Sequence, residues 1–142
     1  MPFLAIKALP APLAQDPIII DATNYFPDRD AWIAEIERHK KTTSQVVAEH
    51  FQSSKVVKAF NTIGMTVLAR LAQPEEPVDR IAVPYAGDDE QAKKVVASLI
   101  WTIGFEPFDL GGLATSFPAQ ADGSLFLVNE TAPVLRQHLN PE

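Results

Sequence analysis

The stretch KVVKAFNTIG (residues 55–64) joins two patterns end to end. Its first half is an apolar run typical of a strand buried on both faces, and a helical pattern begins near Thr62. Between them stand Phe60 and Asn61, an aromatic ring and a short uncharged polar side chain. Ligands of open α/β sheets lie outside the carboxyl ends of the strands. The stretch therefore predicts both a sheet and the position of a site.

Apolar runs alternate with helical patterns along the rest of the chain. Strands are expected in PIIIDATN (17–24), KVVKAF (55–60), RIAVPY (80–85) and EPFDLGG (106–112). Helices are expected over about 30–40, 42–51, 62–72 and 88–103, and a short one up to His138 follows a loop-like stretch. This alternation predicts an α/β domain, residues 1–142, with a largely parallel sheet.

Single residues sharpen these boundaries. Thr42 and Gln45 have the spacing of a capping box at a helix start. Asp88 is expected to cap the next long helix, which Gly104 ends. Pro84 has no backbone donor and is expected to mark the end of its strand.

The composition is that of an ordinary globular protein and excludes several functions. A net charge of −6 argues against binding nucleic acid or an anionic membrane surface. The absence of cysteine excludes disulfides and thiolate metal sites, and the three histidines stand alone, so no metal site is expected. No apolar run approaches the roughly 20 residues of a membrane span, and no signal peptide is recognisable, so a cytoplasmic location is expected.

The carboxyl ends of the expected strands supply the candidate site residues. Thr23, Asn24 and Asn61 offer uncharged donors and acceptors that suit a carboxamide or a ribose, and Phe60 could form an apolar wall for a flat ring. Simpler interpretations stay open, because Asn commonly forms turns and Thr62 could cap the helix that begins there. No Ser-His-Asp order and no carboxylate pair predicts acid–base chemistry, so no catalytic residue is assigned.

A family resemblance rests on three segments in a fixed order. PIIIDATNYFP (17–27), KVVKAFNTIG (55–64) and VPYAGDDEQAKKVVASLIWTIGFEPFDLGGLA (83–114) resemble the C-terminal two-thirds of the NADP-dependent reductases of the deazaflavin-coenzyme (F-420) type, also called predicted dinucleotide-binding enzymes. The cytosolic reductase domain of the six-transmembrane metalloreductases is similar too. The match covers about residues 1–115. It implies a Rossmann-type doubly wound sheet that lacks its first βαβαβ half, with MPFLAI (1–6) near the end of the fourth strand.

The resemblance also implies an activity and roles for ten residues. The activity is hydride transfer between NADP and a flat acceptor, such as a deazaflavin or flavin, and it needs stacked rings and exclusion of water more than acid–base groups. The residues implied to bind the cofactor are Pro2, Phe3, Thr23, Asn24, Phe60 and Asn61. Those implied to bind the substrate are Thr62, Gly111, Gly112 and Leu113.

One expected motif is missing from the 142 residues. The glycine fingerprint G-x-G-x-x-G, which holds a pyrophosphate at a helix N-terminus, does not occur. We therefore expect NADPH to bind this chain weakly, with a Kd above ~1 mM. Two alternatives stay open: a non-catalytic truncated remnant that serves as an oligomeric or partner-binding module, and a half-enzyme completed by a separate chain that carries the fingerprint.

The missing half also predicts self-association. Without the preceding strands, PIIID (17–21) becomes an edge strand although its residues are apolar on both faces. Exposed apolar edges pair with other strands. We expect a homo-oligomer formed edge to edge, or coverage of the edge by MPFLAIKALP (1–10), folded back or swapped.

Overall fold

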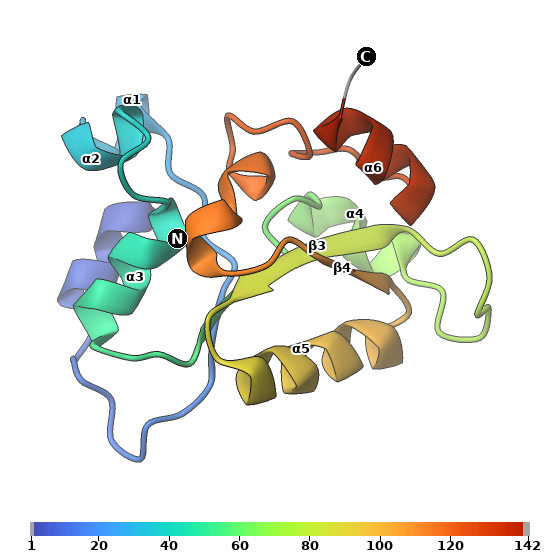
Figure 1. Ribbon diagram of the computed structural model, residues 1–142, viewed down its shortest axis with the longest axis horizontal. Coiled ribbons are helices and arrows are strands. Elements are labelled where there is room, and N and C mark those ends of the chain that lie inside the picture. The colour runs from blue at the N-terminus through green and yellow to red at the C-terminus, as the bar shows by residue number, and fades with distance from the viewer. Residues whose placement is uncertain (1, 141–142) are drawn as a thin grey trace.

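The computed structural model describes residues 2–140 and forms a four-stranded sheet with helices on both faces (Figure 1). The strands lie side by side in chain order: β1 (Ile19–Asp21), β2 (Val56–Ala59), β3 (Ala82–Gly87) and β4 (Glu106–Asp109). The helices are α1 (Pro27–Asp30), α2 (Ala34–Glu37), α3 (Thr43–Phe51), α4 (Met65–Leu71), α5 (Glu90–Ile103) and α6 (Ala132–Leu139), with 3-10 helices at Phe3–Ala8, Leu113–Thr115 and Phe117–Ala119. The predicted α/β, Rossmann-like class is confirmed.

The sheet is mostly parallel, with one reversal at its centre. β1 pairs with β2 in parallel, as β3 does with β4, but β2 and β3 are antiparallel, with Val57 opposite Gly87 and Ala59 opposite Tyr85. The chain between β2 and β3 contains only the short α4, and it enters β3 from the end at which it left β2. The carboxyl ends of β1 and β2 therefore lie at one end of the sheet, and those of β3 and β4 at the other.

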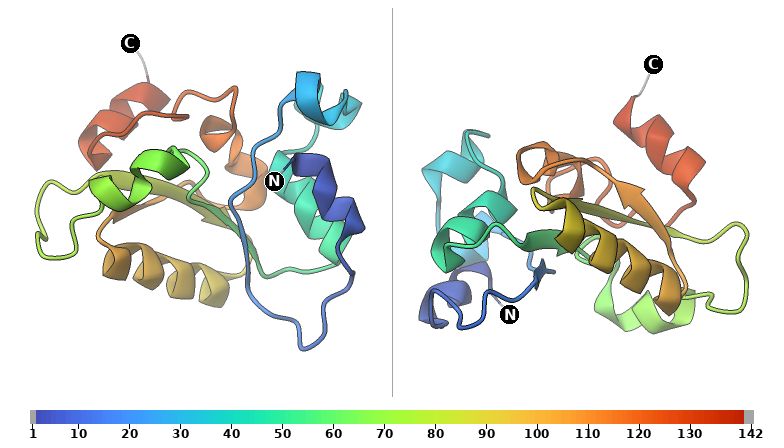
Figure 2. Two further views of the ribbon diagram at one scale, coloured as in Figure 1. Left: turned by 180° about the vertical axis from the view of Figure 1, so that it is seen from behind. Right: turned by 60° about the horizontal axis from the view of Figure 1, so that its bottom comes forward.

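Helices cover the two faces unequally. α4 and α5 pack on one face, where Val67 and Ile100 join a cluster with Val57 and Val83. α3 covers the other face over β1 and β2, and α6 covers that face over β3 and β4. α5 and α6 accordingly lie on opposite sides of the sheet (Figures 1 and 2). None of the helices within residues 2–140 is long and apolar enough to cross a membrane.

Two predicted boundaries are wrong by a short distance. Pro84 lies inside β3, opposite Phe108, because its backbone faces away from β4 at a position that β2 does not reach. The N-cap of α5 is Asp89, whose side chain accepts a hydrogen bond from the backbone of Ala92 at 2.7 Å. Asp88 instead accepts a hydrogen bond from the backbone N–H of Leu113 at 2.9 Å. The capping box at Thr42 is confirmed.

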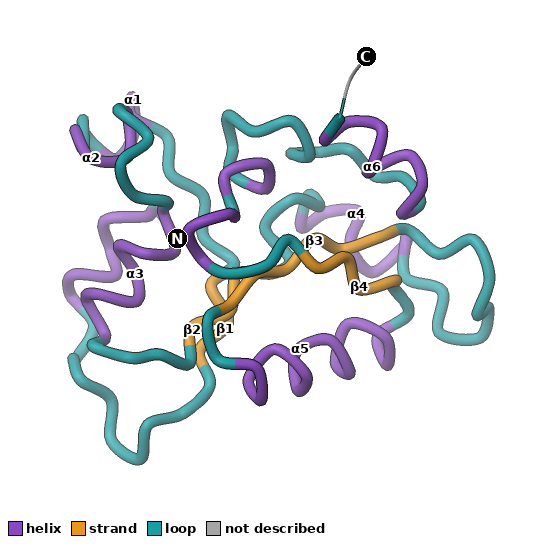
Figure 3. The backbone as a smooth tube through the Cα atoms, in the orientation of Figure 1, coloured by secondary structure: helices purple, strands orange, loops and turns teal. Residues whose placement is uncertain are grey.

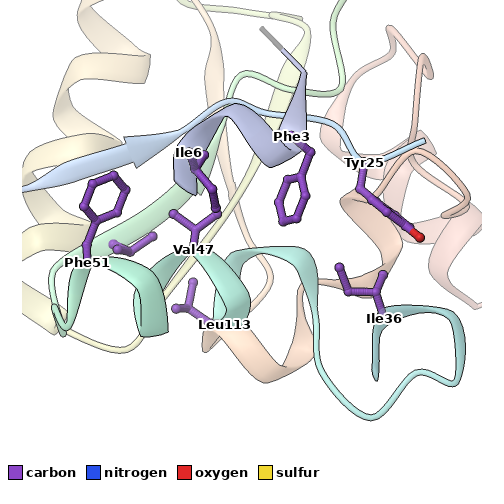
Figure 4. Close-up of a cluster of buried hydrophobic side chains, with 8 residues drawn as sticks. Phe3, Ile6, Tyr25, Ile36, Val47, Phe51 and Leu113 are labelled. Carbon is purple, nitrogen blue, oxygen red and sulfur yellow. The ribbon is translucent and has the colours of Figure 1, made fainter. Parts of the chain in front are cut away.

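The N-terminal segment packs into the core as a helix. Phe3–Ala8 forms a 3-10 helix where the sequence predicted the end of a strand. Phe3 is fully buried, and its ring meets that of Tyr25 edge to face at 5.6 Å between centroids. Figure 4 shows Phe3 and Ile6 pointing into a cluster with Val47 of α3. The segment therefore folds back over one face of the sheet, and it does not pair with the edge of β1.

The helix predicted over 30–40 is wrong in its bounds: two short helices, α1 and α2, form instead and are separated by a break that begins at Ala31. This residue adopts φ 72° and ψ 161°, a conformation that costs a residue with a side chain about 1–3 kcal/mol. The hydroxyl of Tyr25 stabilises this non-helical backbone. It donates a hydrogen bond to the carbonyl of Ala31 and accepts one from the N–H of Ile33, each at 3.0 Å. A tertiary contact therefore overrides the helical pattern.

We expect Ala31→Gly to stabilise the protein by about 0.5–1 kcal/mol. Glycine adopts a positive φ without a Cβ clash, which stabilises the folded state. The greater conformational freedom of glycine in the unfolded chain offsets part of this gain. Urea denaturation followed by circular dichroism measures the change. Ala34→Gly, in α2, is the matched control and should destabilise by roughly the same amount. Destabilisation by Ala31→Gly would show that the backbone at this position is unstrained.

Candidate functional site

A groove of about 560 Å³ lies at the carboxyl ends of β1 and β2, on the face that α4 covers. Four predicted residues line it: Thr23, Asn24, Phe60 and Asn61. The others that line it are Ile20, Ala22, Phe26, Arg29, Ile63, Gly64, Met65, Leu68, Phe126 and Leu127. This volume is in the range of small-molecule sites, and most of the lining residues are apolar.

Two asparagines lock together at the base of the groove. The side-chain amide of Asn61 donates to Asn24 Oδ1 at 3.0 Å and to the carbonyl of Ala119 at 2.6 Å. In return, the amide of Asn24 donates to the carbonyl of Asn61 at 3.2 Å. These bonds fix which end of the Asn61 amide is oxygen, because both of its N–H donors already have acceptors.

The locked pair leaves one acceptor free. Asn61 is 3% exposed, and its Oδ1 has no hydrogen-bond partner among the described residues. A buried polar atom without a partner costs about 1–3 kcal/mol. Asn61 lines the groove, but its Oδ1 has almost no accessible surface, so a ligand that carries an N–H or O–H donor could satisfy this oxygen only with a small shift of the groove wall.

Aromatic side chains form the walls. Phe60, directly after β2, has φ 67°, an uncommon conformation for a residue with a large side chain. Across the groove, Phe26 meets Phe126 edge to face at 6.4 Å between centroids. Arg29 lies over the ring of Phe26 and donates to the carbonyl of Asn24 at 2.7 Å. The groove thus combines flat apolar walls with one cation at its rim.

A buried ion pair lies behind the Thr23–Asn24 turn. Lys58 of β2 and Asp21 of β1 are 1% and 2% exposed, with Nζ 3.7 Å from Asp21 Oδ2. Asp21 also accepts hydrogen bonds from the hydroxyls of Ser44 at 2.5 Å and Thr23 at 2.6 Å, and from the backbone of Thr23 at 3.0 Å. Lys58 donates to Thr43 Oγ1 at 3.2 Å and reaches the carbonyl of Thr23 at 3.5 Å. This network joins β1, β2 and the start of α3 to the groove.

The network sets the charge of Asp21. Burial alone would raise the pKa of this carboxyl, but Lys58 and the hydrogen bonds from Ser44 and Thr23 outweigh burial and hold the pKa below its usual value. Asp21 is therefore ionised at neutral pH, and it has no proton to exchange with a ligand in the groove.

Six of the ten predicted residues do not line the groove. Phe3 is a core residue, and Pro2 lies next to it at the start of the 3-10 helix. Thr62 is buried, and its carbonyl accepts from the N–H of Leu127 at 2.9 Å. Gly111, Gly112 and Leu113 follow β4, whose carboxyl end lies at the opposite end of the sheet because β2 and β3 are antiparallel. Leu113 packs beneath α3 in the core.

The wall of the groove that the tail forms was not predicted from the sequence. Phe126 and Leu127 belong to the stretch that is predicted to be loop-like. This stretch returns to the end of β2, where the carbonyl of Ala119 accepts a hydrogen bond from the side-chain amide of Asn61. The N–H of Leu127 donates a second hydrogen bond, to the carbonyl of Thr62. The apolar run LFLV (125–128) was the available signal. No group of three metal-ligating side chains occurs within residues 2–140.

We expect Lys58→Met to destabilise the protein by about 3–5 kcal/mol, because the carboxylate of Asp21 would stay buried without its counter-ion. The loss should be largest at neutral pH and shrink as the pH falls through the pKa of Asp21 in the variant, because removing Lys58 raises that pKa and protonation removes the unpaired charge. Urea denaturation at several pH values measures both effects.

Lys55→Met is the matched control. Lys55 pairs with Asp16 at 3.0 Å, also beside β1, but both side chains are exposed to solvent. Its loss should cost at most about 1 kcal/mol, with no comparable dependence on pH. Equal effects from the two substitutions would mean that Asp21 does not depend on Lys58.

Comparisons with known proteins agree with this architecture. No protein-family profile matches the chain. The metalloreductase STEAP3 of Rattus norvegicus is 30% identical over 98 residues, which are 69% of this chain and 19% of the relative. The crystal structure of a hypothetical protein from Sinorhizobium meliloti aligns with a TM-score of 0.69 and 31% identity, over 91% of this chain and 60% of that one.

A second solved structure, from an Arthrobacter species and described as an F-420-dependent NADP reductase, is 27% identical with a TM-score of 0.44, over 52% of this chain and 33% of that one. The chain thus spans about a fifth of the curated relative and under two-thirds of the first solved structure. The resemblance predicted from the motifs is confirmed for a reductase of the metalloreductase type: over 69% of its own length the chain is similar to one of these proteins, of which it spans about a fifth.

Proposed function

We propose that the groove holds the nicotinamide end of NADP(H) against a flat electron-accepting ring, and that the protein takes part in hydride transfer between them. The observation that carries this proposal is the unpartnered Oδ1 of Asn61, buried at the base of a groove with aromatic walls. A carboxamide presents an N–H donor in the plane of a flat ring, so it suits this acceptor and these walls.

The residues of the groove fit the nicotinamide end and not the rest of the dinucleotide. The 142 residues contain no glycine fingerprint, and Arg29 is the sole cation among the lining residues. Bound reduced nicotinamide would supply a hydride, which carries two electrons to an electron-poor position of the acceptor ring. The protein's contribution is to fix the carboxamide through Asn61, to stack the rings against Phe60 and to exclude water with Phe126 and Leu127.

The relatives support a reductase and leave the acceptor open. One relative is named a metalloreductase, and the sequence motifs resemble reductases that use a deazaflavin. The chain covers only part of each relative, so the activity of the whole relative is part of the proposal. The alternative is a non-catalytic module that serves as an oligomeric or partner-binding unit. Enzymatic oxidation of NADPH in the presence of a deazaflavin, a flavin and a ferric chelate separates the two.

We expect reduced nicotinamide mononucleotide and NADPH to bind with Kd values within about threefold of each other, both above ~1 mM. The reason is that only the nicotinamide end, which both ligands share, would contact the residues that line the groove. NMR titration of ¹⁵N-labelled protein measures these affinities. The side-chain amides of Asn24 and Asn61 should shift, and that of Asn129, which does not line the groove, is the internal control. Micromolar binding of NADPH would contradict this expectation.

Nicotinic acid mononucleotide is the sharper comparison. Its carboxylate offers no donor to Asn61 Oδ1, so we expect binding at least about tenfold weaker than that of the carboxamide. Equal affinity for the amide and the acid would overturn the role of Asn61.

The aromatic wall is tested separately. Phe60→Gly removes the ring but tolerates the positive φ, and it should weaken binding of the mononucleotide by about 3–10-fold, whereas Phe60→Tyr should not.

A further inference from the structure

α5 carries two apolar rows, one buried and one at the surface. Each row repeats every fourth residue, a spacing that keeps its members on one side of a helix. The row that packs on the sheet consists of Ala92, Val96 and Ile100. The second row consists of Val95, Leu99 and Ile103, which are 46%, 40% and 38% exposed. The first row therefore covers the sheet, and the second row faces solvent.

The place of the second row in the fold indicates a partner from outside the domain. In a layered α/β fold one face of each helix packs on the sheet, and the opposite face meets solvent, where polar side chains are expected. Figure 1 shows α5 as the outer layer on its side of the sheet. Further strands at either edge would widen the sheet and leave the outer face of α5 uncovered. Apolar side chains gathered in such a place mark an interaction surface.

The charges near the two ends of α5 are opposite in sign. Lys94, in the first half of the helix, is exposed and forms no ion pair within residues 2–140. The C-terminal end adjoins an acidic loop (residues 73–79), because the N–H of Gln73 donates to the carbonyl of Gly104 at 2.9 Å. Glu75 and Glu76 of this loop are exposed, and neither forms an ion pair within the same residues. The exposed face of α5 thus has one cationic and one anionic end.

We propose that α5 packs against α5 of a second copy of this chain, antiparallel about a two-fold axis beside Leu99. In this register Leu99 of each copy meets Leu99 of the other. Val95 lies opposite Ile103, because both are four positions from Leu99. All three apolar side chains of each copy are then covered. A two-fold interface needs the same patch on both partners, and a row that is symmetric about its central residue provides it.

Charge complementarity supports a second copy as the partner and selects the antiparallel orientation. Lys94 and Gly104 both lie five positions from Leu99, about 7.5 Å along the helix axis. Lys94 of one copy therefore lies opposite Gly104 of the other, beside Glu75 and Glu76, and this contact occurs twice. A parallel pairing would place like charges together at both ends. None of these residues lines the groove, so the interface is independent of the ligand proposed above.

Sedimentation equilibrium of the whole chain from ~1 to ~100 µM tests the assembly. One helix pair gives an interface at the small end of the specific range, so we expect a dimer that dissociates on dilution. Leu99→Glu should raise the Kd of the dimer at least about tenfold, because it places two like charges on the axis. Leu9→Glu is the matched control, since Leu9 is 42% exposed and lies outside α5, and it should leave the dimer intact. A wild-type monomer throughout this range, or a dimer that survives Leu99→Glu, would overturn the proposal.

Charge reversal tests the orientation with exposed residues alone. Lys94→Glu in one variant, and Glu75→Lys with Glu76→Lys in another, should each weaken the homodimer about 3–10-fold, because both end contacts then join like charges. An equimolar mixture of the two variants should form a heterodimer about as stable as the wild-type dimer, because both contacts again join opposite charges. Sedimentation velocity with one variant fluorescently labelled measures the mixed species. A mixture that dimerises no better than the separate variants would refute the antiparallel arrangement.

Discussion

The buried ion pair between Lys58 and Asp21 is the interaction on which the site depends. It joins neighbouring residues of two parallel strands, and its remaining hydrogen bonds reach the start of α3 and the Thr23–Asn24 turn. A charge pair in such a place is costly unless every member is satisfied. Here hydroxyls of Ser44, Thr43 and Thr23 complete it, so the turn that carries Asn24 has a fixed position relative to Asn61.

The groove is assembled from segments far apart in the chain. The β1 and β2 turns supply its polar base, α4 supplies one apolar side, and the tail after Ser116 supplies another. Figure 3 shows this tail running from β4 to α6 on the side of the sheet that α6 covers, and hydrogen bonds to Asn61 and Thr62 join the tail to the end of β2. The contact between Asn61 and Ala119 joins the base to this tail. The orientation of the Asn61 amide, and hence its free acceptor, is set by that contact.

The reversal between β2 and β3 explains the division of the predicted site. In an all-parallel sheet the turn after β1, the turn after β2 and the glycines after β4 would lie along one edge. The antiparallel pairing sends Gly111 and Gly112 to the other end, where they allow the chain to turn beneath α3. β1 is the outer strand in the order β1-β2-β3-β4, and Ile20 of β1 lines the groove, so this edge of the sheet and the candidate site lie next to each other.

The sequence by itself determined the four strands, the capping box at Thr42, the α5 helix and the position of four groove residues, because each depends on local periodicity or on a strand end. Only the tertiary structure decided the direction of β3, the break at Ala31, the burial of Phe3 and the return of Phe126 to the groove. Each of these is set by a contact between residues distant in sequence, such as Tyr25 with Ala31 and Ile33, or Leu127 with Thr62, and local pattern carries no information about such contacts.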